Sequence, residues 1–173
     1  ASVFNPDKLL WLNAQYIINS SPAALAEAVL PFLIKNETIH DASAVDMQWL
    51  GRVAYVLRER SKTLVEMAAQ MKYFFPVTIE IDPKARGKYL TPESLQLLSE
   101  VCALMQNLPD VSAQIVEPLV HKLASEKGVK LGAIAQPLRV ALTGGTASPG
   151  IFEVIEIMGK PLVLKRLHHI LAK

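Results

Sequence analysis

The sequence predicts an all-α protein built from two consecutive helical bundles. Apolar residues recur at intervals of three and four over most of the chain, which is the period of an amphipathic helix. Three pairs, Ser21-Pro22, Thr91-Pro92 and Ser148-Pro149, combine a residue type that caps helices with a proline suited to the first turn. Glycines follow several of the periodic segments, where helices commonly end.

Composition supports a folded protein. Hydrophobic residues make up 51% of the 173 residues and charged residues 20%, which is enough to fill a core and excludes intrinsic disorder. The single cysteine, Cys102, excludes an intramolecular disulfide and a multi-cysteine metal site. Neither a signal peptide nor an apolar run long enough to cross a membrane is visible, so we expect a cytoplasmic protein.

The first bundle is expected to cover residues 1–78. Asn5-Pro6-Asp7 signals the start of a first helix, and Ser21 and Pro22 begin a second that runs toward residue 34, with Pro31 predicted to kink or shorten it. A third helix is predicted over 42–60 and a fourth over 63–74.

The second bundle is expected to cover residues 79–173. Pro76 ends the fourth helix, and 75–82 is predicted to be an extended connection followed by a short basic helical turn. Helices are then predicted over 92–106, 112–126, 130–142 (interrupted near Pro137), 148–158 and 160–172, with Gly159 separating the last two.

Groups that could catalyse a reaction are scarce. Cys102 lies on the apolar side of its helix and is expected to be an inert buried thiol. His168 and His169 are adjacent, so their rings diverge on a helix and do not form a chelating pair. We therefore expect neither a catalytic residue nor a metal ligand in this chain.

Two segments stand out as candidate binding regions. The glycine-rich segment 143–150 lacks the lysine of a phosphate-binding loop, which leaves a hinge or a recognition loop near Arg139, and the residues alone favour the hinge. The second segment is Arg58-Glu59-Arg60-Ser61-Lys62. Its cations suit a helix C-terminus, but together with Lys84, Arg86 and Lys88 they also suit contact with nucleic acid.

Several segments resemble the C-terminal, anticodon-binding part of bacterial glutamyl-tRNA synthetases. They are Phe4–Asn13, Arg58–Leu64 with Tyr73-Phe74-Phe75, Glu126–Gly132, Gln136–Gly144, Ser148–Glu153 and Gly159–Leu167. The resemblance spans nearly the whole chain and implies two helical subdomains that form a cage around the anticodon loop of glutamate tRNA.

The resemblance also implies roles for particular residues. The two anticodon-reading arginines of the family fall on Arg60 and Arg139, and the loop residues that contact anticodon bases fall on Ser148, Pro149 and Ile151. Arginine at position 60 favours an enzyme that discriminates glutamate tRNA from glutamine tRNA. Lys62, Lys84, Lys88 and Lys130 are expected to attract phosphates without regard to sequence.

The nucleotide-binding signatures of class I synthetases are absent from this chain. Because these signatures are missing, we expect no cofactor and no aminoacylation by this chain alone. The resemblance implies that the full-length family enzyme uses ATP and magnesium. We expect it to act with a catalytic domain of the same polypeptide and to be monomeric. The alternative is a helical protein-interaction module without RNA function, and a free-standing enzyme is disfavoured by the lack of a catalytic set.

Overall fold

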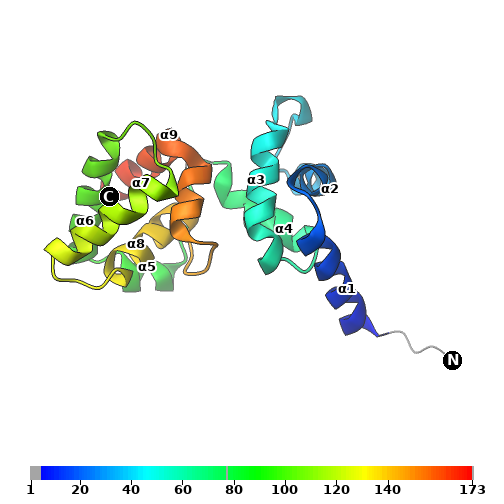
Figure 1. Cartoon of the computed structure of the whole chain (residues 1–173), viewed down its shortest axis with the longest axis horizontal. Helices are drawn as coiled ribbons and strands as arrows, with labels where there is room; N and C mark the ends of the chain where they lie inside the picture. The colour runs from blue at the N-terminus through cyan, green and yellow to red at the C-terminus, as the bar shows by residue number, and fades with distance from the viewer. Residues whose placement is uncertain (1–4, 77, 173) are drawn as a thin grey trace. The chain divides into compact units, whose positions relative to one another are not determined.

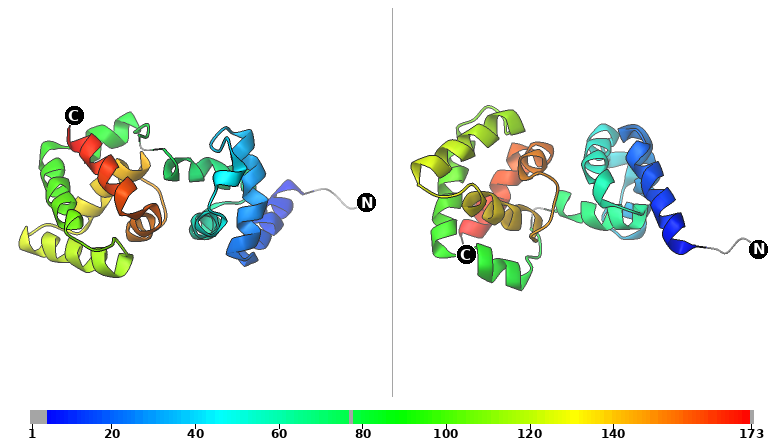
Figure 2. Two further views of the ribbon diagram at one scale, coloured as in Figure 1. Left: turned by 90° about the horizontal axis from the view of Figure 1, so that it is seen from above. Right: turned by 60° about the horizontal axis from the view of Figure 1, so that its bottom comes forward.

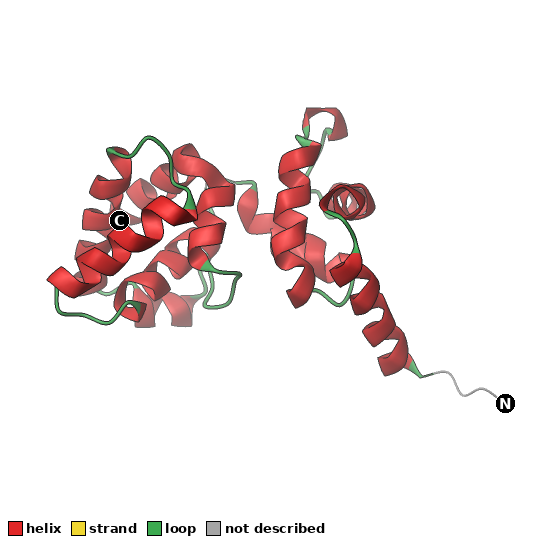
Figure 3. Ribbon diagram, viewed as in Figure 1, coloured by secondary structure: helices red, strands yellow, loops and turns green. Residues whose placement is uncertain are grey.

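The computed structural model describes residues 5–76 and 78–172, and the regular structure within these ranges is entirely helical (Figure 1, Figure 3). The all-α prediction is therefore confirmed. The chain divides into two compact units, Ala1–Phe75 and Pro76–Lys173. The sequence analysis placed the boundary after residue 78, and the structure divides the chain between Phe75 and Pro76.

Within residues 5–75, the described part of the first unit, the chain forms four α-helices and short 3₁₀ turns. They are α1 (Pro6–Asn19), α2 (Pro22–Lys35), α3 (Met47–Leu57) and α4 (Leu64–Met71), with 3₁₀ turns at Ala42–Ala44, Arg58–Arg60 and Lys72–Phe74. The predicted starts of α1 and α2 are confirmed. The Asn5 side chain accepts hydrogen bonds from two amides of the first turn of α1, and Ser21 caps α2 in the same way.

The predicted third helix was wrong at its start, whereas its predicted end near residue 60 matches the end of the 3₁₀ turn that follows α3. The Asp46 carboxylate accepts hydrogen bonds from the amides of Gln48 and Trp49, at 2.9 and 3.0 Å, so α3 begins at Met47 rather than near residue 42. The helix ends at Leu57, and residues 58–60 continue as a 3₁₀ turn. Asp46 therefore acts as a cap that separates α3 from the 3₁₀ turn before it.

The core of the first unit lies where α2 packs against α3 and α4. Fully buried apolar side chains from each of these helices meet there, including Val29, Leu33, Leu50, Val53, Leu57, Met67 and Met71. The ring of Trp49 meets Phe74 and Phe75 edge-on, with centroid separations of 6.4 and 5.3 Å. These contacts join the end of the first unit to its core.

The described residues of the second unit, 76 and 78–172, form five helices. They are α5 (Pro83–Tyr89), α6 (Pro92–Gln106), α7 (Ala113–Glu126), α8 (Gly132–Thr143) and α9 (Ile151–Leu171). The bounds predicted for α6 and α7 are confirmed to within one residue. Helices α6, α8 and α9 pack against one another around buried Leu98, Met105, Ile134, Leu138, Ile155 and Leu167, and α7 covers α8 and α9.

Helix α9 consists of two segments, as the sequence analysis predicted. Gly159 has φ 75° and ψ 155°, which are non-helical values open mainly to glycine. In Figure 2 the orange and red parts of α9 run in different directions within the second unit. The start was predicted at Ser148-Pro149, but the helix begins at Ile151 with Gly150 as its N-cap.

Prolines within helices interrupt the fold less than the sequence suggested. Helix α2 continues past Pro31 to Lys35, and α8 continues past Pro137 to Thr143. The interruption predicted near Pro137 was therefore wrong. Pro137 is buried within the second unit, so the apolar ring packs in the core while the helix loses one backbone donor.

Candidate functional site

The turn between α3 and α4 presents two cations from a rigid backbone. The Ser61 hydroxyl is buried and donates to the Leu57 carbonyl at 3.0 Å, and the Gln70 amide donates to the Arg60 carbonyl at 3.0 Å. Because the backbone is held on both sides, the exposed side chains of Arg60 and Lys62 project from a fixed corner. We call residues 58–62 the arginine corner.

The start of α4 strengthens the arginine corner. The Glu66 carboxylate accepts a hydrogen bond from the Lys62 amide at 2.8 Å, and the Glu66 amide donates to the Thr63 hydroxyl at 3.1 Å. The Asn13 side chain of α1 donates to the Lys62 carbonyl. Three segments of the first unit therefore converge on this corner.

Arg58 differs from Arg60 because it is engaged within the first unit. Its guanidinium carbon lies 3.6 Å from the centroid of the Tyr55 ring, and its Nη1 donates to the Tyr55 carbonyl at 2.6 Å. Its Nη2 also forms a hydrogen-bonded ion pair with Glu59 at 3.2 Å. This stack was not predicted from the sequence, although the three-residue spacing of Tyr55 and Arg58 on a helix is a signal that indicates it.

The second candidate region is the loop between α8 and α9. The chain leaves α8 through Gly144, whose φ of 81° is left-handed. Arg139 reaches back from α8, and its Nη1 donates to the Pro149 carbonyl at 2.7 Å, to the Ser148 carbonyl at 3.1 Å and to the Ser148 hydroxyl. We call residues 144–150 the serine-proline loop.

Burial in the serine-proline loop constrains the roles predicted for its residues. Ser148, Pro149 and Ile151 are all buried, and Arg139 is half-buried. The exposed residues of the loop are Thr146, Ala147 and Gly150, which the sequence analysis did not single out. In this conformation Arg139, Ser148 and Pro149 hold the loop together, and their contact with anticodon bases stays a prediction.

The four lysines predicted to attract phosphates are all exposed. Lys62 belongs to the first unit, whereas Lys84 and Lys88 lie one turn apart on α5 and Lys130 precedes α8 in the second. Among the described residues the ion pairs involve other cations, namely Arg58, His121, Lys122 and Lys127. The charges of the four lysines and of Arg60 are therefore not neutralised by a carboxylate of the described chain.

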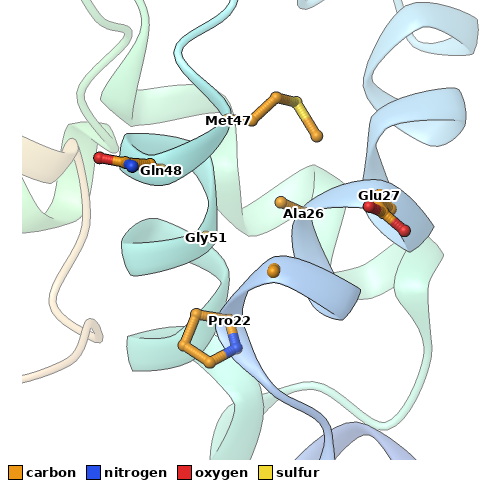
Figure 4. A pocket seen from close by; sticks show the side chains of 7 residues that line it. Pro22, Ala26, Glu27, Met47, Gln48 and Gly51 are labelled. Carbon is orange, nitrogen blue, oxygen red and sulfur yellow. The ribbon is translucent and has the colours of Figure 1, made fainter.

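A shallow groove of 340 Å³ lies between α2 and α3 (Figure 4). The two helices approach closely at Gly51, one of the lining residues, where an added Cβ would lie 2.8 Å from the Pro22 carbonyl oxygen. The wall of the groove is mostly apolar, and Glu27 and Gln48 are the polar side chains among its lining residues. The groove therefore lacks the converging acid, base or nucleophile that a reaction needs.

Metal binding, thiol chemistry and membrane insertion can each be compared with the structure. Within residues 5–76 and 78–172, no three histidine, cysteine or acidic side chains gather as metal ligands would. Cys102 is 3% exposed, and burial raises the pKa of its thiol above the ordinary value, as the inert-thiol interpretation requires. None of the helices described has the length and apolar character to span a bilayer.

The chain is similar to glutamate–tRNA ligases over nearly its whole length. The chain is 42% identical to a glutamate–tRNA ligase of Thermodesulfovibrio yellowstonii over 170 residues, which are 98% of this chain and 37% of that protein. It is 44% identical to a glutamate–tRNA ligase of Geobacter sulfurreducens over 172 residues, which are 99% of this chain and 36% of that protein. The chain thus spans little more than a third of the length of these relatives.

A solved structure has the same fold. The crystal structure of a glutamate tRNA ligase from Elizabethkingia meningosepticum, in complex with its amino acid, superposes with a TM-score of 0.86 at 25% identity, covering 98% of this chain and 33% of that one. The family model described as an anticodon binding domain matches residues 24–171, which include the arginine corner, the serine-proline loop and most of both units. The chain belongs to the anticodon-binding domain family.

Proposed function

We propose that this chain is the tRNA-binding part of a glutamate–tRNA ligase and that it grips the anticodon loop of glutamate tRNA. The observation that supports this most is sequence identity above 40% to several glutamate–tRNA ligases across nearly the whole chain. The relatives are named for the complete reaction. The chain's share in that reaction would be to recognise the anticodon and to position the tRNA, while a catalytic domain of the same polypeptide binds ATP and magnesium.

The arginine corner is suited to reading an unpaired base. A guanidinium offers two parallel donors to a base edge and a flat face for stacking. Arg60 is exposed, its carbonyl is held by Gln70, and its charge has no carboxylate partner among the described residues. Arg60 therefore retains its hydrogen-bonding capacity for a ligand, and the fixed backbone reduces the entropy lost when it binds.

The serine-proline loop is proposed to contribute a second contact. Arg139 and the buried Ser148, Pro149 and Ile151 give the loop a defined shape, and its exposed residues then meet the RNA. Direct contact of Arg139 with a base would require its hydrogen bonds to the loop to be exchanged for bonds to the RNA. Lys62, Lys84, Lys88 and Lys130 would add attraction to phosphates.

The proposed link to a longer polypeptide agrees with the surface of α1. Leu9, Trp11 and Tyr16 are 53%, 61% and 69% exposed, which is unusual for such large apolar and aromatic side chains on one helix. Because the relatives are almost three times as long as the match, we propose that the remainder of such a polypeptide packs around α1. The complete protein is proposed to be a cytoplasmic monomer.

Binding to two RNA fragments tests the proposal. The chain should bind an isolated anticodon stem-loop of glutamate tRNA more tightly than an acceptor-stem minihelix of the same tRNA, as measured by fluorescence anisotropy. Affinity should also fall steeply with added salt, because phosphate contacts release counterions. Equal binding to both fragments, or binding to neither, would contradict anticodon recognition and favour the alternative of a protein-interaction module.

A further inference from the structure

The segment that joins the two units is fastened to the second unit at several points. Arg166 of α9 is only 2% exposed, and its Nη2 donates to the Pro76 carbonyl, at the first residue of that unit. The Nη1 of the same guanidinium donates to the Leu142 carbonyl in the last turn of α8. One buried side chain therefore joins the connection to the C-terminal end of α8.

The far end of the connection is held against the same end of α8. The Asp82 amide donates to the Gly144 carbonyl at 2.9 Å. A Cβ added at Gly144 would lie 2.2 Å from the Glu80 carbonyl oxygen, so the connection passes directly over this glycine. Residues 76 and 80–82 thus contact one corner of the second unit.

The chemistry of this corner explains why an arginine lies there. The last carbonyls of a helix have no partner within the helix, and the helix dipole makes this end negative. A guanidinium can satisfy a carbonyl of the helix and a carbonyl of the connection together, because its donors form a planar fork. Burying a guanidinium is costly unless it is hydrogen-bonded, so its two bonds to backbone carbonyls point to a role in fixing the connection.

We propose that Arg166 is a positioning residue that keeps the connection bound to the second unit and so limits the orientations available to the two units. If residues 76–82 were released, a flexible chain of this length would allow its ends to separate by about 15 Å on average and to move freely. If the two units moved separately, the arginine corner and the serine-proline loop would bind one RNA less tightly. Once one of them is bound, the effective concentration of the other near the RNA would be lower. The RNA part of this inference rests on the proposed function.

Substitutions at two positions, Arg166 and Gly144, release the connection from opposite ends. Arg166→Met removes the donors while retaining an unbranched apolar stem, and Arg166→Lys retains the charge without the planar fork. Gly144→Ala places a methyl group against the Glu80 carbonyl. Gly128→Ala is its matched control, because Gly128 has a similarly positive φ of 65° at the end of α7 and open space where the Cβ would lie.

The first measurement does not involve RNA. Val65 of the first unit and Lys122 of the second are both exposed, and each is replaced by cysteine in a Cys102→Ala background. Spin labels on these two cysteines report the distribution of distances between the units by pulsed electron paramagnetic resonance. We expect the distribution to broaden in Arg166→Met and Gly144→Ala, less in Arg166→Lys, and not in Gly128→Ala. Helix content and thermal unfolding identify variants that fail to fold. If the Arg166 variants fail to fold, the comparison of Gly144→Ala with Gly128→Ala tests the inference.

The second measurement is affinity for the whole tRNA. Variants with a broadened distance distribution should bind the tRNA about 3- to 10-fold more weakly, because the arginine corner and the serine-proline loop no longer contact it together as often. An unchanged distribution in both Arg166→Met and Gly144→Ala would overturn the inference whatever the RNA does. A broadened distribution with wild-type affinity would overturn the positioning role. If the wild-type chain binds no tRNA, the proposed function fails and the distance distribution alone decides the anchoring.

Discussion

Arg139 and Pro149 are joined by a hydrogen bond of 2.7 Å from the guanidinium Nη1 to the carbonyl oxygen, which ties the loop before α9 back to α8. The same Nη1 also donates to the Ser148 carbonyl, at 3.1 Å. The residue implied by the resemblance to read a base thus already has backbone partners. Its role in shaping the loop can be tested apart from any role in binding RNA.

Replacing Arg139 should destabilise the second unit. Arg139→Met leaves the carbonyls of Ser148 and Pro149 without this charged donor, and such hydrogen bonds contribute about 1.5–3 kcal/mol. The free energy of unfolding measured in urea should fall by a similar amount, and amide exchange in 144–150 should accelerate. Arg86→Met, at an exposed position of α5, is the control and should change neither quantity. Equal stability of the two variants would contradict the anchoring role of Arg139.

Replacing Arg60 should weaken RNA binding without affecting the fold. The Arg60 side chain is exposed, so Arg60→Ala should leave the unfolding curve unchanged while costing about 1–3 kcal/mol in discrimination at one anticodon base. Binding to anticodon loops of glutamate and glutamine tRNAs measures this directly. Arg52→Ala, an exposed position of α3 in the same unit, is the matched control. The assigned role is wrong if Arg60→Ala leaves both affinities unchanged.

The lysines of α5 should influence the salt dependence rather than the sequence preference. Replacing Lys84 and Lys88 together by glutamine should reduce the slope of log affinity against log salt by about 1 to 2, because two phosphate contacts are lost. The control replaces Lys122 and Lys127, which pair with Glu126 and Glu100. If the control pair changes the slope as much as the α5 pair, the phosphate contacts are not located on α5.

Burial of Cys102 predicts a dependence of stability on pH. Since burial raises the pKa of its thiol in the folded state, the thiol ionises at lower pH in the unfolded chain. The contribution of the neutral thiol to stability is therefore complete below the unfolded pKa and is lost as pH rises through the folded one. The free energy of unfolding, measured in urea, should be lower at pH values above about 9 than at pH 7. This decrease should be smaller in Cys102→Ala. An identical decline in both proteins would contradict this assignment.

The sequence predicts most helices well because their ends are chemically marked. Asn5, Ser21 and Thr91 each precede a proline and cap a helix as expected. The cap at Asp46 was missed because apolar residues continue on both sides of it, so the periodicity appeared unbroken. Pro137 was expected to interrupt its helix, but burial of its ring outweighs one lost hydrogen bond.

The candidate site was less predictable for a physical reason. Spacing along the chain indicates which residues can approach each other, but it does not indicate which polar groups are consumed within the fold. Arg139 and Ser148 were recognised as neighbours, yet their mutual hydrogen bonds and the burial of Ser148 depend on the tertiary path of the loop. Arg166 had no local signal at all, because its partners Leu142 and Pro76 are distant in sequence.

The proposed function is recognition of the anticodon of glutamate tRNA by this chain. The most direct measurement compares its affinity for glutamate tRNA with its affinity for the same tRNA body carrying an unrelated anticodon, at one fixed salt concentration. We predict weaker binding to the altered tRNA by about 1–3 kcal/mol for each base that is read, because phosphate contacts are unchanged while base contacts are lost. Equal affinity for the two tRNAs would show that the chain does not read the anticodon.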